Sequence, residues 1–328
     1  MDQQATRRSS GLARLSDGFA GAVTRGLVAI FAALPHRVAL GIARSAADLA
    51  YALGMRRRIL RRNLELIYGQ ERSPEERARI ARSATRNLFL TLVEGLRVSR
   101  PDARDEILSQ VSFEPRALHE DLLRETRGIV FVVAHSGNFD LCGLRFAQGS
   151  DQRLAVVMKP PKAPAVNALL VEGRERFGFD VLSVSEPGLL RRLIRLTNRG
   201  GRVCLLPDQH ARKTGVMTRF LGHPARTHRG PAFIALKSPA ARLIVAVDTR
   251  IDDGPRHVCY FKEISDFEPS GDTRTDVVRL TQRINDAMGE LIAKHPDSYL
   301  WHHSRWRIPT QRGIERAPAA TSSEASTP

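Results

Sequence analysis

The sequence predicts an α/β protein with a single, largely parallel central sheet covered by helices and a helical N-terminal region. Three observations lead to this fold class. Short apolar runs rich in β-branched residues recur after Arg127, segments with helical periodicity separate them, and the first hundred residues carry only helical patterns. A run that is apolar throughout is typical of a strand buried on both faces, as in parallel sheets with helical crossovers.

Five apolar runs are predicted to be strands, and four segments between or after them are predicted to be helices. The strands are expected at residues 128–134, 154–158, 202–207, 242–248 and 257–264. The helices are expected at residues 163–177, 188–199, 230–238 and about 275–294. Gly200 and Gly201 end the second of these helices, because glycine commonly terminates a helix.

The N-terminal region has helical periodicity up to about residue 100. Its apolar stretch from Phe19 to Leu53 is broken at Pro35, and the longest uncharged run covers only residues 26–36. A membrane-spanning helix needs about 20 nearly uncharged residues. We therefore expect one or two helices that lie on, or dip into, a bilayer.

A further N-terminal helix begins with Ser73, Pro74 and Glu76. This is a capping box with proline at the first helical position. The expected organisation is a disordered basic tail at 1–16, a helical membrane-associated region at 17–100, an α/β domain at 101–312 and a disordered low-complexity tail at 313–328.

Charge predicts an anionic partner, such as a membrane surface or an acidic protein. The chain has 51 Lys and Arg against 35 Asp and Glu, and its first hundred residues hold 18 arginines, no lysine and eight acids. Arginine suits phosphate and carboxylate, although a GC-rich genome would produce the same preference. Nucleic-acid binding is a rival class, but no RNP, KH, zinc-finger or homeodomain pattern is present and only 6% of residues are aromatic. We therefore expect no nucleic acid.

The cysteines predict neither a disulfide framework nor a metal site. Cys142, Cys204 and Cys259 each lie inside an apolar run and form no CxxC pair, so the spacing that either role needs is missing. We expect no metal and no cofactor. No signal-peptide pattern with a small-residue cleavage site is present, and secretion is not expected.

The first strand exit carries the main candidate site, because ligands of an open α/β sheet bind beyond the carboxyl ends of its strands. His135 follows the strand, and Asp140 comes five positions later across a turn that contains Gly137 and Asn138. A carboxylate that orients one imidazole nitrogen leaves the other to take a proton from a hydroxyl, which predicts a general base. Free N–H groups at the start of the next helix could stabilise an oxyanion. A satisfied structural His–Asp pair is the alternative.

Polar residues follow other apolar runs as well. Lys159 and Lys162 follow the second strand, and a third group precedes a helix that opens at Gly230, where an anion could bind. The residues after the third strand are Asp208, Gln209 and His210, and the group before Gly230 comprises His223, Arg226, Thr227, His228 and Arg229. Each segment alone also fits a solvated loop. Together they predict a basic, histidine-containing rim near His135.

A rival chemistry uses the same residues. His135, Asp140 and Asp208 could hold a metal ion in a hydrolase or phosphatase. The cations Lys159 and Arg226 nearby would oppose the binding of a metal cation. We therefore favour chemistry without a metal.

Several blocks, in chain order, resemble the bacterial lipid A biosynthesis acyltransferases within the wider HxxxxD/E glycerolipid acyltransferase superfamily. The blocks are RRRILRRNLELIYG followed by SPEER and Glu94, HSGNFD, MKPPKAP followed by RERFG, LPDQ, FLGHPARTHRGPA and HPDSYLWHHSRWR. The resemblance extends over about residues 17–308.

The resemblance implies an enzyme that moves a fatty acyl chain from an acyl thioester, as co-substrate, to a lipid hydroxyl. It implies that His135 is the general base and Asp140 its orienting acid. Lys159 stands where the family's second block has arginine, and Asp208 is the acid of the third block. The residues expected to bind substrate are Gly137, Asn138, Lys159, Asp208, Gln209, Arg226, Thr227 and Arg229.

The resemblance also implies partners and a location. The donor would be acyl carrier protein or acyl-CoA, and the acceptor a phosphorylated lipid or glycolipid such as a lipid A precursor. The cluster from Arg56 to Arg62 suits an acidic carrier protein and an anionic membrane surface equally. The protein would be anchored at the cell inner membrane with its catalytic domain on the cytoplasmic face.

Two departures leave the acceptor open. Lipid A acyltransferases usually carry Glu at the position of Asp140 and Arg at the position of Lys159. HSGNFD also resembles the corresponding block of actinobacterial phosphatidylinositol mannoside acyltransferases. A glycerolipid, a lysophospholipid or a phosphatidylinositol mannoside is therefore the alternative acceptor.

Overall fold

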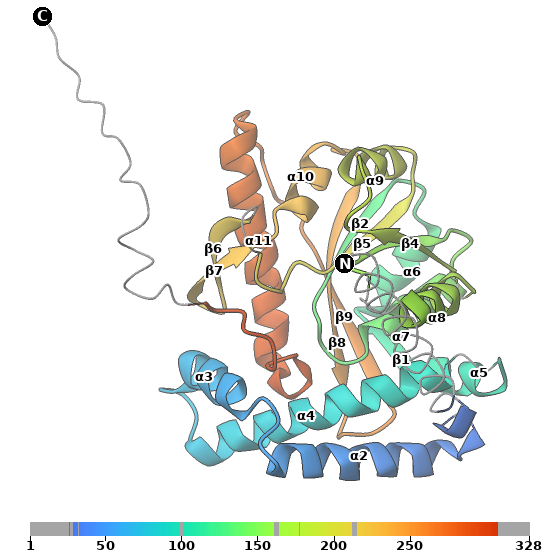
Figure 1. Cartoon of the computed structure of the whole chain (residues 1–328). Coiled ribbons are helices and arrows are strands. Elements are labelled where there is room, and N and C mark those ends of the chain that lie inside the picture. Colours follow the sequence, from blue (N-terminus) through green and yellow to red (C-terminus); the bar gives the residue numbers. More distant parts are fainter. Residues whose placement is uncertain are drawn as a thin grey trace, which may run out of the picture.

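A computed structural model describes residues 26, 29–31, 33–98, 101–160, 164–176, 178–211 and 215–307. Both predicted tails lie outside these residues, as do Lys162 and the start of the predicted apolar stretch at residues 19–25. Figure 1 shows a central sheet with helices on both faces and three N-terminal helices, α2, α3 and α4, lying across one end of the sheet. The predicted α/β class is confirmed.

The central sheet has seven strands in the order β1-β9-β8-β2-β5-β3-β4. They are β1 (Val111–Glu114), β2 (Ile129–Val133), β3 (Leu154–Met158), β4 (Phe179–Ser183), β5 (Arg202–Leu205), β8 (Arg242–Arg250) and β9 (His257–Glu263). The five strands from β8 to β4 are mutually parallel, whereas β9 pairs antiparallel with β8 and β1 parallel with β9. All five predicted strands are present. The sequence analysis missed β1 and β4, because each is short and interrupted by polar residues.

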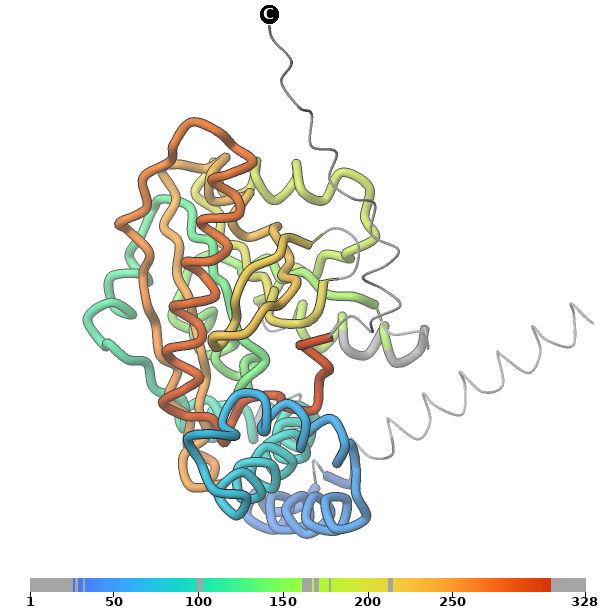
Figure 2. Tube along the Cα trace, turned by 90° about the vertical axis from the view of Figure 1, so that its left-hand side faces the viewer, coloured from blue at the N-terminus to red at the C-terminus, as the bar shows by residue number. Residues whose placement is uncertain are grey.

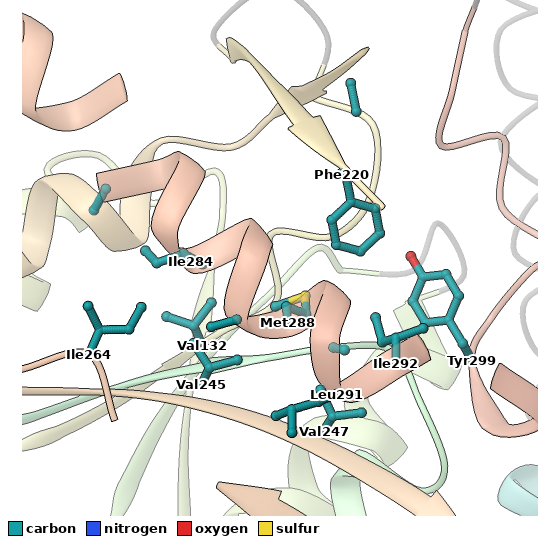
Figure 3. Close-up of a cluster of buried hydrophobic side chains, with 14 of the residues drawn as sticks. Val132, Phe220, Val245, Val247, Ile264, Ile284, Met288, Leu291, Ile292 and Tyr299 are labelled. Carbon is teal, nitrogen blue, oxygen red and sulfur yellow. The ribbon is translucent and has the colours of Figure 1, made fainter. Parts of the chain in front are cut away.

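Strand β2 divides the core into two layers, since successive side chains on a strand point to opposite faces. Val130 and Val132 pack in one apolar cluster, and Ile129, Phe131 and Val133 pack in the other. Figure 3 shows the first cluster, in which strand valines face the apolar stripe of α11 (Thr273–Lys294). Figure 2 shows α11 running along this face of the sheet. The continuous apolar pattern of β2 thus reflects burial on both sides.

The remaining helices cover the two faces and the ends of the sheet. They are α5 (Pro101–Ser109), α6 (Arg116–Arg124), α7 (Phe139–Gln148), α8 (Pro164–Arg176), α9 (Leu189–Asn198) and α10 (Gly230–Leu236). A short 3₁₀ helix follows α11 at Pro296–Ser298. The predicted helices at 163–177, 188–199, 230–238 and 275–294 correspond to α8, α9, α10 and α11, with boundaries that differ by at most two residues.

The segment before α10 is a hairpin and not the expected loop. Strands β6 (Val216–Phe220) and β7 (His223–Thr227) pair antiparallel and pack against α11. Leu221 and Gly222, which connect them, have φ angles of 48° and 78°. Two residues with positive φ are typical of the tight turn that joins twisted strands, so the turn chemistry explains the hairpin.

The three N-terminal helices are α2 (His36–Ala52), α3 (Arg57–Tyr68) and α4 (Pro74–Arg97). Small residues Ala39 and Ala43 of α2 pack with Leu90 of α4, which lets the two helices approach closely. At the start of α4, Ser73 Oγ accepts from the Glu76 N–H (3.2 Å) and Glu76 accepts from the Ser73 N–H (2.8 Å), so the predicted capping box is confirmed.

Within the described part of the chain, no single helix has the length and apolar character needed to cross a bilayer. Helices α2 and α3 meet these requirements only as a pair, with a bend of 86° between them.

Candidate active site

His135 and Asp208 meet at the carboxyl ends of two neighbouring parallel strands. His135 follows β2, Asp208 follows β5, and β2 pairs with β5. One oxygen of Asp208 lies 2.6 Å from the His135 Nδ1, and the other accepts the His135 backbone N–H at 3.0 Å. Asp208 is only 1% exposed, whereas the His135 side chain is 20% exposed. The carboxylate therefore holds both the ring and the backbone of His135.

These contacts define the charge and the tautomer of His135. Burial lowers the pKa of His135, but the charge and hydrogen bond of Asp208, with a smaller contribution from Asp140, outweigh it and raise the pKa above 6.5. For Asp208, burial acts in the opposite direction and raises the pKa. The contacts with His135 outweigh burial and bring the pKa of Asp208 below its ordinary value. Asp208 is thus a carboxylate. Because it accepts from Nδ1–H, the neutral ring presents an unprotonated Nε2.

Asp140 does not make the contact expected of it. It lies in the first turn of α7, and Arg174 of α8 binds its two oxygens at 3.2 and 2.7 Å. No hydrogen bond joins it to His135 among the described residues. The orienting bond expected from Asp140 comes from Asp208 instead, because sheet pairing brings Asp208 next to His135, while Asp140 faces α8.

Backbone N–H groups of the turn after His135 bind other parts of the protein and hold the turn in place. Gly137 has a φ of 57°, and its N–H donates to the Ser298 carbonyl at 2.9 Å. The N–H of Asn138 donates to Asp248. These two N–H groups are therefore occupied within the protein, and the oxyanion donors expected at the start of the next helix would be later N–H groups of α7.

The side chain of Asn138 is also part of this framework. It is 1% exposed, donates to Glu94 at 2.9 Å and caps α7 by accepting from the Leu141 N–H at 3.3 Å. The Gly137 carbonyl accepts from Asn87 and Thr91 of α4. Gly137 and Asn138, which we expected to bind substrate, attach the turn to α4 through these contacts.

Four buried charged residues surround this turn. Arg250 makes two 2.6 Å bonds to Glu94, and His257 lies 2.7 Å from Asp248 and 3.5 Å from Glu94. Burial lowers the pKa of His257, but Asp248 and Glu94 outweigh burial and Arg250 and raise it to about 9. Two acids and two bases therefore balance in a site from which water is excluded, as buried charges require.

The sequence analysis missed three of these residues. Asp248, Arg250 and His257 are charged or polar positions of otherwise apolar strands, and each is at most 6% exposed. The sequence did contain a signal for them, namely polar or charged residues within strands that were expected to be buried. Such residues are rarely buried unless they are paired, so their presence indicates a buried pair.

A second buried framework holds the segment that carries Asp208. Arg305 is 1% exposed and donates to Thr227 Oγ1 and to the Arg226 carbonyl, both at 2.6 Å, and to the Gln209 carbonyl at 3.2 Å. Thr227 is fully buried. Thr227, which we expected to bind substrate, is therefore part of the support behind the site.

A cavity of about 420 Å³ opens in front of His135. Its polar walls come from His135, Asp140, Lys159, Arg174, Gln209 and His228. Gln209 Nε2 lies 3.4 Å from the His135 Nε2. Since that ring nitrogen is an acceptor, the amide group that faces it is the NH₂ donor.

A smaller apolar cavity of about 40 Å³ adjoins the cavity at His135, between the sheet and α7. It shares five wall residues with the cavity at His135, namely Val133, Phe139, Gly143, Leu154 and Cys204. Cys142 and Cys259 also line it. The shared wall residues place a small apolar space directly beside the cavity at His135.

The remaining predicted residues lie elsewhere on the rim. Arg226 lines a separate cavity of about 410 Å³ with His210 and His223, and Arg229 lines another of about 500 Å³. No group of three or more His, Cys, Asp or Glu suited to hold a metal ion occurs among the residues that the structure describes.

Replacing Gly137 tests whether the turn needs glycine. A Cβ on Gly137 would lie 2.0 Å from Asp248 Oδ2, whereas a Cβ on Gly54, which also has positive φ (84°), would meet nothing within 4 Å. We expect Gly54→Ala to cost about 1 kcal/mol of unfolding free energy from backbone strain alone. Gly137→Ala should cost about 3–4 kcal/mol, because a steric clash adds to the strain. Denaturant unfolding measures both values, and equal losses would contradict the packing described here.

Residues 15–308 match the family model described as bacterial lipid A biosynthesis acyltransferase. The chain is 31% identical over 183 residues, 53% of its length, to the phosphatidylinositol mannoside acyltransferase of Mycobacterium tuberculosis (strain ATCC 25618 / H37Rv), and 30% identical over 185 residues to that of Mycolicibacterium smegmatis. The matches span only 52% and 55% of these two relatives.

A third relative is matched over more of its length. The chain is 26% identical over 261 residues to the lipid A biosynthesis palmitoleoyltransferase of Escherichia coli (strain K12), which covers 78% of this chain and 80% of the relative. The family match extends over almost all the described residues, including His135 and Asp208. The chain therefore belongs to the bacterial lipid A biosynthesis acyltransferase family.

Proposed function

We propose that the protein transfers a fatty acyl group from an acyl thioester to a hydroxyl of a phosphorylated glycolipid, with His135 as general base. One observation carries the proposal: the His135 ring, oriented by Asp208, faces a cavity that is bordered by a small apolar pocket. This arrangement pairs a proton acceptor with space for a hydrocarbon chain. Family membership supports the same reaction type.

The proposed step is a direct acyl transfer. His135 Nε2 takes the hydroxyl proton while the hydroxyl oxygen attacks the thioester carbonyl carbon. The tetrahedral intermediate collapses, the C–S bond breaks, and the imidazolium returns the proton to the leaving sulfur. The products are an ester and a free thiol. Asp208 fixes the tautomer and stabilises the imidazolium.

The described cysteines are poor candidates for a covalent intermediate. Burial raises the pKa of Cys204 to about 12 and also raises the pKa values of Cys142 and Cys259. All three are therefore neutral thiols near pH 7, and the thiolate is the nucleophilic form. This supports transfer without an acyl-enzyme.

Other groups in the cavity have roles that follow from their chemistry. The Gln209 amide, 3.4 Å from the reacting nitrogen, can donate to the thioester oxygen as negative charge develops there. Lys159 is exposed at the rim and can bind a phosphate. Asp140 and Arg174 form an ion pair in the wall, and the charge of Asp140 supports protonation of His135.

The acceptor is proposed to be a lipid A precursor. The Escherichia coli relative, whose name refers to lipid A, is matched over 78% of this chain. Phosphatidylinositol mannoside is the second candidate, because the mycobacterial relatives that carry this name are more similar over a shorter segment. Both are phosphorylated glycolipids, and both suit a basic rim.

The donor and the membrane are proposed to meet the N-terminal helices. Val38, Ile42, Leu49 and Leu53 of the α2 segment are 47%, 44%, 62% and 79% exposed. Their spacing places them on one side of the helix. An apolar face beside many arginines is typical of a helix in a membrane interface. We place the protein at the cytoplasmic face of the inner membrane, with acyl carrier protein or acyl-CoA as donor.

The core proposal is tested by acyl transfer itself. Purified protein is incubated with palmitoyl-CoA or palmitoyl-acyl carrier protein and with either a lipid A precursor or a phosphatidylinositol mannoside. Mass spectrometry should detect an acceptor heavier by one acyl group. If neither acceptor gains an acyl group from either donor, the proposed function is wrong.

Asp208→Asn tests the orienting carboxylate. We expect kcat to fall about 10²- to 10⁴-fold, because the ring loses its fixed tautomer. Activity requires neutral His135 and falls as the pH drops through its pKa. Asp208 raises that pKa, so the residual activity of the variant should persist to lower pH than in the wild type.

Asp140→Asn is the matched control. It leaves the His135–Asp208 bond in place, so the ¹⁵N spectrum of His135 should keep the Nδ1–H form that Asp208→Asn loses. The assignment of Asp208 is refuted if Asp140→Asn, rather than Asp208→Asn, abolishes this signal.

The apolar pocket is expected to limit acyl-chain length. Ala246 lines its inner wall and is 3% exposed. Ala246→Leu should fill the pocket, cost about 1–3 kcal/mol of stability and shift the ratio of kcat/KM values toward shorter acyl-CoAs by about tenfold. Ala240→Leu, an exposed position outside the pocket, should keep the wild-type ratio. An unchanged ratio in folded Ala246→Leu would exclude this pocket as the acyl site.

Vesicle binding tests the membrane face. Replacing both Ile42 and Leu49 by Glu should weaken sedimentation with phosphatidylglycerol-containing vesicles by about tenfold, because two exposed apolar contacts become charged. Val278→Glu, which changes an exposed apolar residue of α11 that is 38% exposed, should bind as the wild type does. If the wild type and both variants bound the vesicles equally, α2 would not be the membrane-binding surface.

A further inference from the structure

A second apolar groove adjoins the cavity at His135. It has a volume of about 500 Å³ and runs beside the first residues of α9 and α10. Four wall residues, Val157, Val184, Leu206 and His228, also line the His135 cavity. We call this second space the α9–α10 groove. The two spaces are therefore neighbours at the carboxyl ends of β3 and β5.

The core pocket and the α9–α10 groove, which we call the two arms of the site, lie on opposite faces of the sheet. Val156 and Leu206 pack with the cluster on the α7 side, where the core pocket lies. Val157, Leu189 and Leu205 pack with the cluster on the α11 side. Consecutive strand residues point to opposite faces, so the α9–α10 groove and the core pocket diverge from a common point near His135.

The arms differ in how they end. The core pocket is bordered by buried side chains, and its volume of about 40 Å³ has room only for the end of a hydrocarbon chain. The α9–α10 groove remains open at its rim, where Leu190 is 40% exposed and Val184 is 50% exposed. A chain in the groove could therefore extend beyond the surface of the protein.

Two cationic side chains lie next to the α9–α10 groove. Arg229 lines the α9–α10 groove, Lys159 lines the His135 cavity, and both side chains are exposed. Neither makes an ion pair with another residue that the structure describes. An exposed cation beside an apolar groove matches the two parts of a phospholipid, a hydrocarbon chain and an anionic head group.

We propose that the α9–α10 groove binds a hydrocarbon chain of the acceptor lipid, with Arg229 and Lys159 facing its phosphate, while the donor's acyl chain lies in the His135 cavity with its end in the core pocket. This inference rests on the proposed function, since acyl transfer must bring two apolar substrates together at one imidazole. The closed arm suits a chain that is delivered singly on a thioester. The open arm suits a lipid whose other chains stay in the membrane.

Leu190→Trp tests the groove by kinetics. A bulky side chain at the rim should raise the KM for a lipid A precursor or a phosphatidylinositol mannoside about tenfold or more. The preference among acyl-CoA chain lengths should stay as in the wild type, because the core pocket is untouched. Val278→Trp, at a similarly exposed position of α11, is the matched control and should keep the wild-type KM. Equal acceptor KM values in the two variants would overturn the proposal.

Photolabelling tests occupancy without relying on turnover. Phosphatidylinositol with a diazirine in one acyl chain should label α9 and the start of α10. Palmitoyl-CoA with a terminal diazirine should label residues around Cys142 and Cys259. Both adducts are located by peptide mass spectrometry, and adducts of the lipid probe in the core pocket would overturn the assignment.

The two levels of the proposal fail differently. If the wild type acylates neither acceptor, the proposed function is wrong, and photolabelling still decides which arm binds lipid. If the wild type acylates an acceptor and Leu190→Trp behaves as Val278→Trp does, only the groove assignment is wrong.

Discussion

The carboxylate of Asp208 holds His135 at two points, and the proposed chemistry depends on that contact. One oxygen accepts from the backbone N–H and the other lies 2.6 Å from Nδ1. A buried carboxylate is costly unless it is paired, so Asp208 and His135 stabilise each other. The result is an imidazole with one tautomer and one orientation, and its free nitrogen faces the cavity. Neither residue has these properties alone.

The site is assembled from both parts of the chain. Helix α4 contributes Glu94 and Asn87, which bind the turn after His135, and β8 contributes Asp248 and Arg250 from the sheet side. Removing one partner of a buried pair typically costs about 3–5 kcal/mol. This cost explains why α4 is held firmly against the sheet. A helix next to the proposed membrane-facing α2 is thus connected directly to the turn that carries the proposed base.

The apolar spaces are the basis on which lipid substrates are proposed for this site. An oriented histidine alone is compatible with many reactions, and it is the adjoining pocket in the core and the open α9–α10 groove that favour two hydrocarbon substrates. Their position on opposite faces of the sheet follows from the alternation of side chains along β3 and β5. The same alternation that builds a two-layer core therefore also separates the two proposed chains.

The sequence by itself determined the strands of the parallel core, the helices after them, the start of α4 and the place of His135 at a strand exit. These features depend on local periodicity and on capping residues, which neighbours in the chain specify. The tertiary structure alone decided which carboxylate meets His135. Asp140 is five residues away but turns toward Arg174, whereas Asp208, 73 residues away, is brought into contact because β2 and β5 are neighbours. Strand order depends on packing across the whole chain, so no local pattern could have distinguished the two acids.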